Sequence, residues 1–326
     1  MEVIVEKIKK DGKNKTYDCI IGLSGGVDSS YLTYIAKEKL GLRPLVLMVD
    51  TGWNVNASNE NVSKLIKGLN LDLYTVVVDW EEMKDLQLAF LKSQVPYQDT
   101  PQDHAIFAGL YNYAAKNGFK YVLTGGNYST EGVKPPCEWT YLNDIRMIRD
   151  VHRKFGKQPL RTFPLCGMFT YRIFYRYFKG MQVIRPLNMV PYHKEDATAE
   201  LEKRFGWQQY GNKHYDNIFT RFYEGYWMPK KFGYDKRKAY LSSLILSGQM
   251  SRQEALEILE NPPYDEALAI QDLEYIANKL DITKESFIEL MKGENKTFRD
   301  YKNSEKILKL AIKLAMLVGM EKRNFR

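Results

Sequence analysis

The residues with the clearest chemical meaning lie at positions 23–30, which read Leu-Ser-Gly-Gly-Val-Asp-Ser-Ser. The apolar run before them, residues 17–23, is typical of a buried strand, and the residues after them are apolar at helical spacing. A glycine-rich turn therefore joins a strand to the start of a helix. Free backbone N–H groups and the positive end of the helix dipole meet at such a turn, so the pattern predicts a phosphate site.

The residue types within this turn suit phosphate binding. Gly25 and Gly26 allow positive φ and a close approach of the backbone to a phosphate. Hydroxyl donors are supplied by Ser24, Ser29 and Ser30. Asp28 would repel phosphates unless a Mg²⁺ ion lay between them, so we predict that it binds the metal, with a helix-capping role as the alternative. The segment is neither a Walker A loop nor G-x-G-x-x-G.

The first half of the chain alternates apolar runs with helical patterns. We predict strands at residues 17–23, 44–50, 73–79, 120–124 and 183–187, with helices near 31–40, 56–69, 80–91 and 102–117. Continuous apolar strands separated by helices are typical of a parallel sheet covered on both faces. Ligands of such sheets bind beyond the carboxyl ends of the strands. We therefore expect three polar segments, 24–30, 50–54 and 125–131, to converge on one nucleotide.

The character of the chain changes near residue 191, where helical patterns take over and a capping box occurs at residues 251–254. We predict an α/β nucleotide-binding domain over residues 1–190 and a mainly helical substrate or partner region over residues 191–326. No repeat or low-complexity linker separates them.

Composition indicates a globular protein of a reducing compartment. The chain has 326 residues, 44% hydrophobic and 27% charged, with a formal net charge of +8. No apolar run approaches a membrane span, and the first residues do not resemble a signal peptide. Three scattered cysteines argue against a disulfide framework, so we expect a cytoplasmic protein. The basic residues are densest at 230–238 rather than massed in one arm, and nucleic acid is an unfavoured partner.

Several residues outside the first loop are candidates for ligand contacts. Asp50 ends the second strand and is predicted to contact the nucleotide, with a simple turn role as the alternative. Gly125 and Gly126 are predicted to lie against the nucleotide. His104, near a helix start, and the basic residues Lys231, Lys236 and Arg237 are predicted to bind substrate, the basic residues through its anionic part. A satisfied core histidine and a solvated helix face are the competing interpretations.

The loop resembles the SGGxDS signature of PP-loop ATP pyrophosphatases, which belong to the HUP-like, adenine nucleotide alpha hydrolase fold. Two further blocks, residues 123–132 and 231–250, are similar to the N-acetyl sugar amidotransferases of the WbpG and PseA type, found in lipopolysaccharide (O-antigen) and nonulosonic acid pathways. The resemblance covers nearly the whole chain. The last block is the more specific, because generic PP-loop enzymes lack it.

The resemblance implies a reaction and a set of partners. ATP, with Mg²⁺, would adenylylate the acetamido group of a nucleotide-activated sugar or nonulosonic acid. Ammonia from a HisH-like glutaminase, sometimes with a HisF-like subunit, would then displace AMP and leave an acetamidino group. It implies catalytic roles for Asp28, Asn127, Glu131 and Lys194, with Lys194 reaching a phosphate and Asn127 and Glu131 holding metal or the reacting amide.

Two observations restrict this interpretation. Many family members carry a cysteine-rich, zinc-type segment before the loop, whereas residues 1–16 contain no cysteine, so we predict no zinc. The sequence also lacks a glutaminase nucleophile, because Met1 is not cysteine and residues 164–168 spoil the Gly-x-Cys-x-Gly pattern. Two alternatives stay open: a PP-loop tRNA-modifying enzyme for thiolation or lysidine-type ligation, and a non-catalytic ATP-binding subunit that scaffolds a glutaminase.

Overall fold

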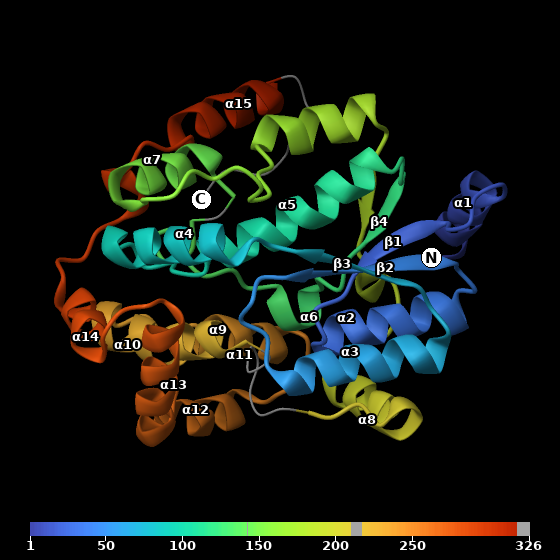
Figure 1. Ribbon diagram of the computed structural model, residues 1–326. Helices are drawn as coiled ribbons and strands as arrows, with labels where there is room; N and C mark the ends of the chain where they lie inside the picture. The colour runs from blue at the N-terminus through green and yellow to red at the C-terminus, as the bar shows by residue number, and fades with distance from the viewer. Residues whose placement is uncertain (142, 210–216, 318–326) are drawn as a thin grey trace.

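The computed structural model describes residues 1–141, 143–209 and 217–317 and contains a five-stranded, wholly parallel sheet (Figure 1). The strands are β1 (Cys19–Gly22), β2 (Pro44–Asp50), β3 (Leu73–Val77), β4 (Tyr121–Leu123) and β5 (Gln182–Ile184). They lie in the order β3-β2-β1-β4-β5. In register, Ile21 of the central strand lies beside Val46 on one side and Leu123 on the other. The predicted α/β fold is confirmed.

The strands alternate between two cores because successive side chains point to opposite faces. Ile20, Leu45 and Leu47 contribute to the core under α4 (Trp80–Ser93), α5 (Thr100–Lys116) and α7 (Ile145–Phe155). Cys19, Ile21 and Val46 contribute to the core on the opposite face. That second face is covered by α1 (Glu2–Gly12), α2 (Val27–Tyr34), α3 (Asn56–Leu69) and α8 (Lys194–Phe205). Both faces of the central strands are therefore dry.

A third core lies outside the sheet and is built mainly from aromatic side chains. The two tryptophans Trp53 and Trp227 are buried there with Phe219, Phe222 and Phe287. The supporting helices are α9 (Ile218–Phe222), the π-helix η4 (Tyr223–Trp227), α10 (Met228–Phe232), α13 (Glu266–Lys279) and α14 (Lys284–Lys292). With α11 (Arg237–Leu246) and α12 (Arg252–Glu260), they form a helical layer on the side of α2 and α6 (Tyr128–Glu131) (Figure 1).

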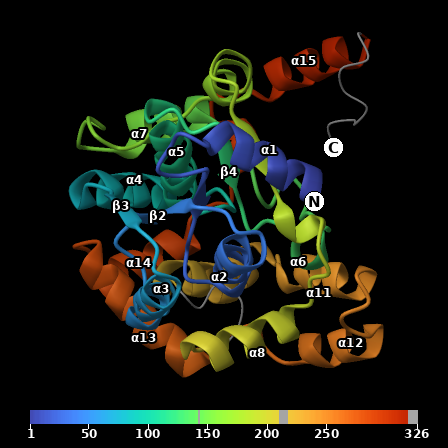
Figure 2. The ribbon, with the colours of Figure 1, turned by 90° about the vertical axis from the view of Figure 1, so that its right-hand side faces the viewer.

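The last helix lies apart from this layer. α15 (Glu305–Leu317) runs beside the π-helix η2 (Thr170–Phe178), across the sheet from α11 and α12, in both views (Figures 1 and 2). The chain leading to it is tied to α7, because the Ser304 N–H donates to the Asp144 carboxylate and the Lys302 N–H to Asp150, 3.0 Å away. The described residues also contain two short 3₁₀ turns, η3 (Pro186–Asn188) and η5 (Phe298–Asp300).

The structure differs from the sequence predictions at several elements. α1, α7 and η2 were not predicted, and the helix expected near residues 31–40 begins at Val27 and ends as the π-turn η1 (Ile35–Lys39). The predicted fifth strand stops at Ile184, because Pro186 opens a 3₁₀ turn. The third strand is an uncovered edge, with the Val77 side chain 73% exposed, so the sheet is not covered everywhere. Helix α8 shares the core of α2 and α3, across the expected boundary at 190.

Candidate active site

The strand order places a topological switch point between β1 and β4. From β1 the chain passes to β2 on one side, whereas β4 lies on the other side of β1. Loops leaving the carboxyl ends of these two strands diverge, and a crevice opens between them where ligands bind in open α/β sheets. The loop 23–26 and the loop 124–127 are the two that leave this point. Both glycine pairs singled out from the sequence therefore lie at one place.

The first loop is held in shape by its own hydroxyl groups. The Ser24 N–H donates to Ser29 Oγ at 3.2 Å, and the two serine oxygens lie 3.1 Å apart. Gly25 has φ +87°, and a Cβ there would lie 2.6 Å from Ser58 Oγ, so this position requires glycine. Gly26, expected to share positive φ, instead has φ −71° and is the N-cap of α2, with no side-chain cap. The first turn of α2 is thus left without a capping side chain.

The second loop packs directly on that turn. A Cβ on Gly125 would lie 2.9 Å from both the carbonyl carbon of Asp28 and the backbone nitrogen of Ser29. Only glycine lets the end of β4 approach α2 so closely. The next glycine, Gly126, lies near the Glu131 carboxylate, with 3.8 Å from its ideal Cβ position to Oε2. Asp28 and Glu131 are therefore brought to the same crevice.

Asp28 is fixed by two hydroxyl groups. Tyr192 donates to its Oδ1, and Thr130 Oγ1 donates to Oδ2 at 3.2 Å. Burial and the Asp28 charge raise the pKa of Tyr192 well above its usual range, so this phenol stays a donor. Among the described residues, no group of three or more His, Cys, Asp or Glu side chains could hold a metal ion. A Mg²⁺ ion needs only one or two carboxylates besides nucleotide phosphates, a requirement that Asp28 and Glu131 fit.

Lys194 lies close to Asp28 and is tied to the C-terminal helices. Its Nζ donates to Tyr240 Oη at 2.8 Å, and its backbone N–H donates to Gln249 Oε1 at 3.1 Å. The Gln249 Nε2 donates to the Tyr192 carbonyl, also at 3.1 Å. Burial lowers the pKa of Lys194, although the Asp28 charge acts in the opposite direction. One glutamine therefore joins both residues that flank Asp28.

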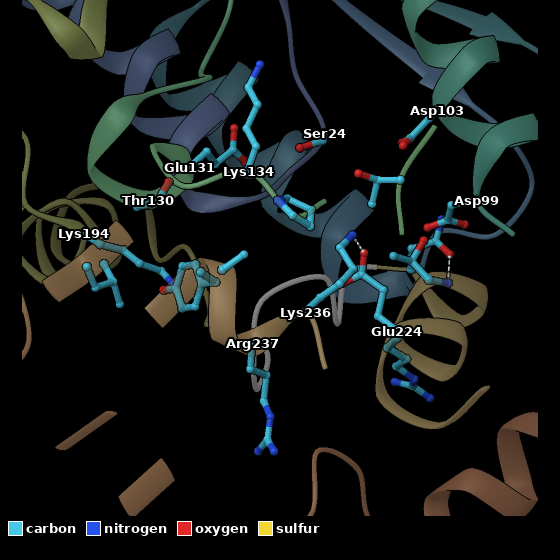
Figure 3. Close-up of a pocket in the computed structure, with 18 of the residues that line it drawn as sticks. Ser24, Asp99, Asp103, Thr130, Glu131, Lys134, Lys194, Glu224, Lys236 and Arg237 are labelled. Carbon is cyan, nitrogen blue, oxygen red and sulfur yellow. Dashed lines mark hydrogen bonds and ion pairs between the residues drawn. The ribbon is translucent and has the colours of Figure 1, made fainter. Parts of the chain in front are cut away.

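A cavity of about 1550 Å³ lies at this crevice, larger than the roughly 300–1,000 Å³ of a typical small-molecule site. Figure 3 shows the Thr130, Glu131 and Lys194 side chains on one side of it and Asp99, Asp103 and Glu224 on the other. Both the sheet half and the C-terminal helices therefore supply its wall. The predicted residues that line it are Ser24, Glu131, Lys194, Lys236 and Arg237.

Three of the predicted contacts have structural roles in this structure, and a fourth, Ser30, lies outside the cavity. Asn127 caps α6, accepting from the Thr130 N–H at 2.8 Å. Asp50 accepts from the Gly52 N–H at 2.8 Å, the turn role anticipated as its alternative. The Ser30 side chain is fully buried and does not line the cavity. Lys231 donates to the carbonyls of Met291 and Gly293 at the C-terminal end of α14 and does not line the cavity.

His104 is a core residue. Its side chain is fully buried in α5, and its Nε2 accepts the Cys166 N–H at 3.2 Å. Burial lowers the pKa of His104 to about 4, so the imidazole is neutral near pH 7. The side chain does not line the cavity. The structure therefore matches the core interpretation rather than the predicted substrate contact.

The basic residues Lys236 and Arg237 pair with carboxylates of the protein itself. Lys236, the N-cap of α11, pairs with Glu224, and Arg237 pairs with Asp235 at 2.8 Å. Arg237 also donates to the carbonyls of Ile258 and Asn261 at the end of α12. Two cations at a helix N-terminus oppose the macrodipole. Here they are balanced by carboxylates, so no ligand is needed to explain them.

The side of the cavity opposite Glu131 was not found from the sequence. Asp99 is the N-cap of α5 and Asp103 lies in its first turn, where the helix dipole favours acidic groups. Glu224 comes from η4, more than a hundred residues later in the chain. Burial, then Asp103 and Glu224, raise the pKa of Asp99 well above its usual range. Only the acidic pair at 99 and 103, next to Pro101, was a signal in the sequence, and it is typical of an ordinary helix start.

Comparison with known proteins finds a match to one family at each end of the chain. Residues 216–315 match the family described as LPS biosynthesis protein WbpG-like, C-terminal domain, and residues 1–131 match the NAD synthase family. Together the two matches support a WbpG-type family of PP-loop ATP pyrophosphatases, in agreement with the resemblance noted in the sequence. This family uses ATP. No helix of the described residues has the length and apolar character needed to cross a membrane.

Individual relatives are similar to this chain over part or most of its length. An uncharacterized protein of Methanocaldococcus jannaschii is 29% identical over 224 residues, covering 62% of this chain and 78% of that protein. One subunit of a glutamine-hydrolyzing GMP synthase from Methanococcus vannielii is 33% identical over 138 residues, 41% of this chain and 42% of that subunit. An NH3-dependent NAD synthetase from Campylobacter jejuni, solved with nitrate, is 17% identical and covers 90% of this chain and 96% of that one, with a TM-score of 0.36.

Proposed function

We propose that this protein is an ATP-dependent amidotransferase that converts the acetamido group of an activated sugar or nonulosonic acid to an acetamidino group in surface polysaccharide or flagellin glycan synthesis. The observation that carries the proposal is the shared cavity. Its wall joins the glycine-rich loop of a PP-loop domain to helices of a WbpG-like C-terminal domain. A nucleotide and a second substrate can therefore meet in one place.

The bond changes balance as follows. The amide oxygen attacks the α-phosphorus of ATP, the bond between the α-phosphorus and the bridging oxygen breaks, and pyrophosphate leaves. Ammonia then adds to the amide carbon and loses a proton, and AMP departs with the former amide oxygen. An amide oxygen is a weak nucleophile, so the enzyme must contribute positioning and charge neutralisation more than a strong base.

In the proposed reaction, the residues of the glycine-rich loop and those around it would have separate tasks. The uncapped first turn of α2, with Ser24 and Ser29, would hold the departing pyrophosphate. Asp28 and Glu131 would hold Mg²⁺, which supplies charge neutralisation at the phosphates when bound. Tyr192 and Thr130 orient the Asp28 carboxylate. Lys194, in its charged form, would turn from Tyr240 toward a phosphate oxygen.

The ammonia would come from a separate glutaminase. Cys166 is buried, with 2% exposure, and burial raises the pKa of its thiol to about 11, so it is no nucleophile for glutamine. The relative from Methanococcus vannielii is one subunit of a glutamine-hydrolyzing enzyme. A HisH-like glutaminase, with or without a HisF-like subunit, is the partner that the sequence resemblance implies.

A tRNA-modifying enzyme is the second candidate, and the cysteines favour it less. Thiolation needs thiolates, which are formed where the pKa of a cysteine is lowered. Burial raises the pKa values of Cys19, Cys137 and Cys166. Of the three, Cys137 lines the cavity. Lysidine-type ligation needs no thiol, so the cysteines say nothing about it, and the assay described next distinguishes it from amidotransfer.

The reaction class is tested by mass spectrometry. We would incubate the protein with ATP, Mg²⁺, an ammonium salt and a panel of acetamido sugars, both free and nucleotide-linked. The expected result is exchange of one oxygen atom for an NH group, with AMP and pyrophosphate formed in equal amounts. ATP consumption that requires added tRNA, with no acetamido sugar converted, would instead support the second candidate. If the protein binds ATP but releases no pyrophosphate under any of these conditions, the result would support a scaffolding role.

A further inference from the structure

The π-helix η2 exposes aromatic side chains at the end of the molecule where it lies beside α15 (Figures 1 and 2). Tyr171 and Tyr175 pack partly against the core under α4, α5 and α7, whereas Phe169, Phe174 and Phe178 are exposed. The rings of Phe174 and Phe178 stack on each other, with centroids 5.8 Å apart. None of the nine residues described in this helix is buried. Clustered apolar side chains that stay in contact with water are typical of a surface that binds a partner.

Helix α15 carries an outward apolar stripe as well. Ile307, Leu310, Leu314 and Leu317 are exposed and recur at intervals of three and four residues, which places them along one side of the helix. Leu308, on another side, is partly buried and lines the cavity. The helix therefore packs on the protein through one side and exposes a second apolar side.

Basic residues accompany these apolar side chains. Residues 151–181 contain seven Lys or Arg and no acid, and residues 306–317 contain three lysines and no acid. We call the exposed side chains of residues 169–179 and 306–317 the basic apolar face. All of its charged side chains are basic: Arg172, Arg176, Lys179, Lys306, Lys309 and Lys313.

Carboxylates near this face leave most of its charge unpaired. Glu305, at the start of α15, pairs with Lys309 at 2.8 Å and with Arg299 at 3.1 Å. Asp150 of α7 pairs with two cations of its own helix. The other five cations of the face form no ion pair with a carboxylate among the residues that the structure describes. A positive surface of this kind attracts anions.

We propose that the basic apolar face binds the surface of a membrane that contains anionic lipid, with η2 and α15 lying in the headgroup layer. Helices that lie in this layer combine Lys or Arg with Phe, Tyr or Leu, as both of these do. The phenylalanine and leucine side chains would reach the boundary of the acyl chains, and the cations would stay with the lipid phosphates. The Lys179 ammonium already lies over the Phe174 ring, 5.9 Å from its centroid, so a charge and an apolar ring are held side by side. This interaction is independent of the reaction proposed above.

Two other classes of partner fit the face less well. A nucleic acid would be attracted by the same cations, and its bases can stack on aromatic rings, but the stripe of Ile307, Leu310, Leu314 and Leu317 offers no stacking surface. The buried centre of a protein interface is typically depleted of lysine, whereas three of the residues at 306–317 are lysines. At a membrane surface, a long lysine side chain lets its charge reach the headgroups while its stem stays on the apolar surface.

Sedimentation with lipid vesicles measures this binding directly. The full chain would be mixed with vesicles of phosphatidylcholine alone and with vesicles of equal parts phosphatidylcholine and phosphatidylglycerol. We expect binding to the anionic vesicles to be about tenfold stronger or more, and to weaken as salt is added. In the double variant Leu310→Gln and Phe178→Gln, binding to the anionic vesicles should fall about tenfold. Leu246→Gln, which changes an exposed leucine of α11 across the sheet, is the matched control and should bind as the wild type does.

A second variant tests the charges without changing any apolar residue. Arg172→Gln combined with Arg176→Gln should reduce the preference for anionic vesicles and leave binding to phosphatidylcholine alone unchanged. All four altered side chains of the two double variants are exposed, so both proteins should keep the melting temperature of the wild type.

The outcomes separate the three classes of partner. The membrane proposal is overturned if the wild type binds neither kind of vesicle, binds both equally well, or loses no affinity in either double variant. It is also overturned if Leu246→Gln weakens binding as much as the change at Leu310 and Phe178. Without vesicle binding, a dimer detected by light scattering and lost in that double variant would make the face a protein interface. Polyuridylate binding that depends on Arg172 and Arg176, again without vesicle binding, would make it a nucleic-acid surface.

Discussion

Asp28 shows how one residue is prepared for its task by groups that are distant in the sequence. Its carboxylate is held by Tyr192 and Thr130, 164 and 102 residues away. Both contacts are hydroxyl donors, which hold the carboxylate in place. A carboxylate held in this way beside a phosphate loop is suited to Mg²⁺, which keeps most of its own water.

Asp28→Asn should lower kcat for pyrophosphate release by about 100-fold, since charge stabilisation worth roughly 3 kcal/mol is lost at the phosphates. The asparagine oxygen still accepts one hydroxyl bond, so the melting temperature should stay close to that of the wild type. Tyr192→Phe, which leaves the charge in place, is the control and should lose much less activity. Equal losses in the two variants would mean that Asp28 acts through packing and not through charge.

His104 should make the stability of the protein depend on pH. Its pKa is about 4 when folded and near 6.5 when unfolded, so between these values only the unfolded chain binds the proton. The free energy of unfolding should therefore fall as the pH falls from 7 to 5, by about 2 kcal/mol from this residue. Urea unfolding of the wild type and of His104→Gln at both pH values measures the difference, because all other titrating groups are shared. Parallel pH dependence in the two proteins would contradict this pKa.

Residue types alone single out the glycine-rich loop but not the carboxylates on the cavity side opposite Glu131, for a physical reason. Glycines and serines act locally, through the backbone of a single turn, so the loop can be recognised in a few consecutive positions. Glu224 and Asp103 line the same cavity although they are 121 residues apart in the chain, and no local pattern encodes that proximity. Likewise, Arg237 and Lys231 look like free cations until the carbonyls and carboxylates that they bind are seen.

At the scale of elements, the site depends on how closely the end of β4 approaches α2. In Gly125→Ala the new methyl group would meet the α2 backbone at 2.9 Å, so we expect the free energy of unfolding to fall by about 1–3 kcal/mol. ATP binding should weaken about tenfold or more, because the first turn of α2 must shift. Calorimetric titration with a non-hydrolysable ATP analogue measures this affinity.

The matched control for this substitution is Gly118→Ala. Gly118 also needs a special backbone, with φ +69°, yet a Cβ there would meet nothing within 4 Å. It should cost about 1 kcal/mol through backbone strain and leave the affinity for ATP unchanged. If both variants bind ATP equally well, contact between the two loops is not what shapes the phosphate site.

We expect Arg237 to stabilise the packing of α11 against the end of α12. Its guanidinium links Asp235 to the last carbonyls of α12, so Arg237→Ala should lower the free energy of unfolding by about 1–2 kcal/mol. The KM values for ATP and for the sugar should barely move. Arg237→Lys keeps the charge without the forked geometry and should rescue little of the stability. A rise in the KM for sugar that Lys reverses would instead restore the predicted role as an anion ligand.

Elements were predictable where their pattern was simple and buried. The four strands β1 to β4 lie within the apolar runs that predicted them. Three of them, β1, β2 and β4, are buried and must be apolar throughout, whereas β3 is an exposed edge strand recognised by its β-branched and aromatic residues. The helices α1, α7 and η2 were missed. Much of η2 faces outward, with Phe178 76% exposed, so it lacks the apolar stripe that marks a core helix.

The whole molecule should use ammonia and not glutamine. With an ammonium salt the purified protein should turn over ATP and its sugar, whereas glutamine alone should support no turnover, because burial raises the pKa of the Cys166 thiol to about 11. Cys166→Ala should keep full ammonium-dependent activity. Product formation from glutamine that disappears in Cys166→Ala would show that the chain carries its own glutaminase.

The bidentate carboxamide of Gln249 has a consequence for exchanging parts between family members. This side chain holds the backbone of Lys194 and of Tyr192, yet it belongs to the C-terminal domain that also lines the cavity. A hybrid made by grafting another member's C-terminal domain onto this ATP-binding half would change the specificity. It would also change the contacts that hold Tyr192 and Lys194 beside Asp28. Such a hybrid should retain ATP chemistry only where the graft brings a glutamine to position 249 and a tyrosine to position 240. Engineers who wish to recombine specificities in this family would do well to treat these two positions as part of the ATP-binding half.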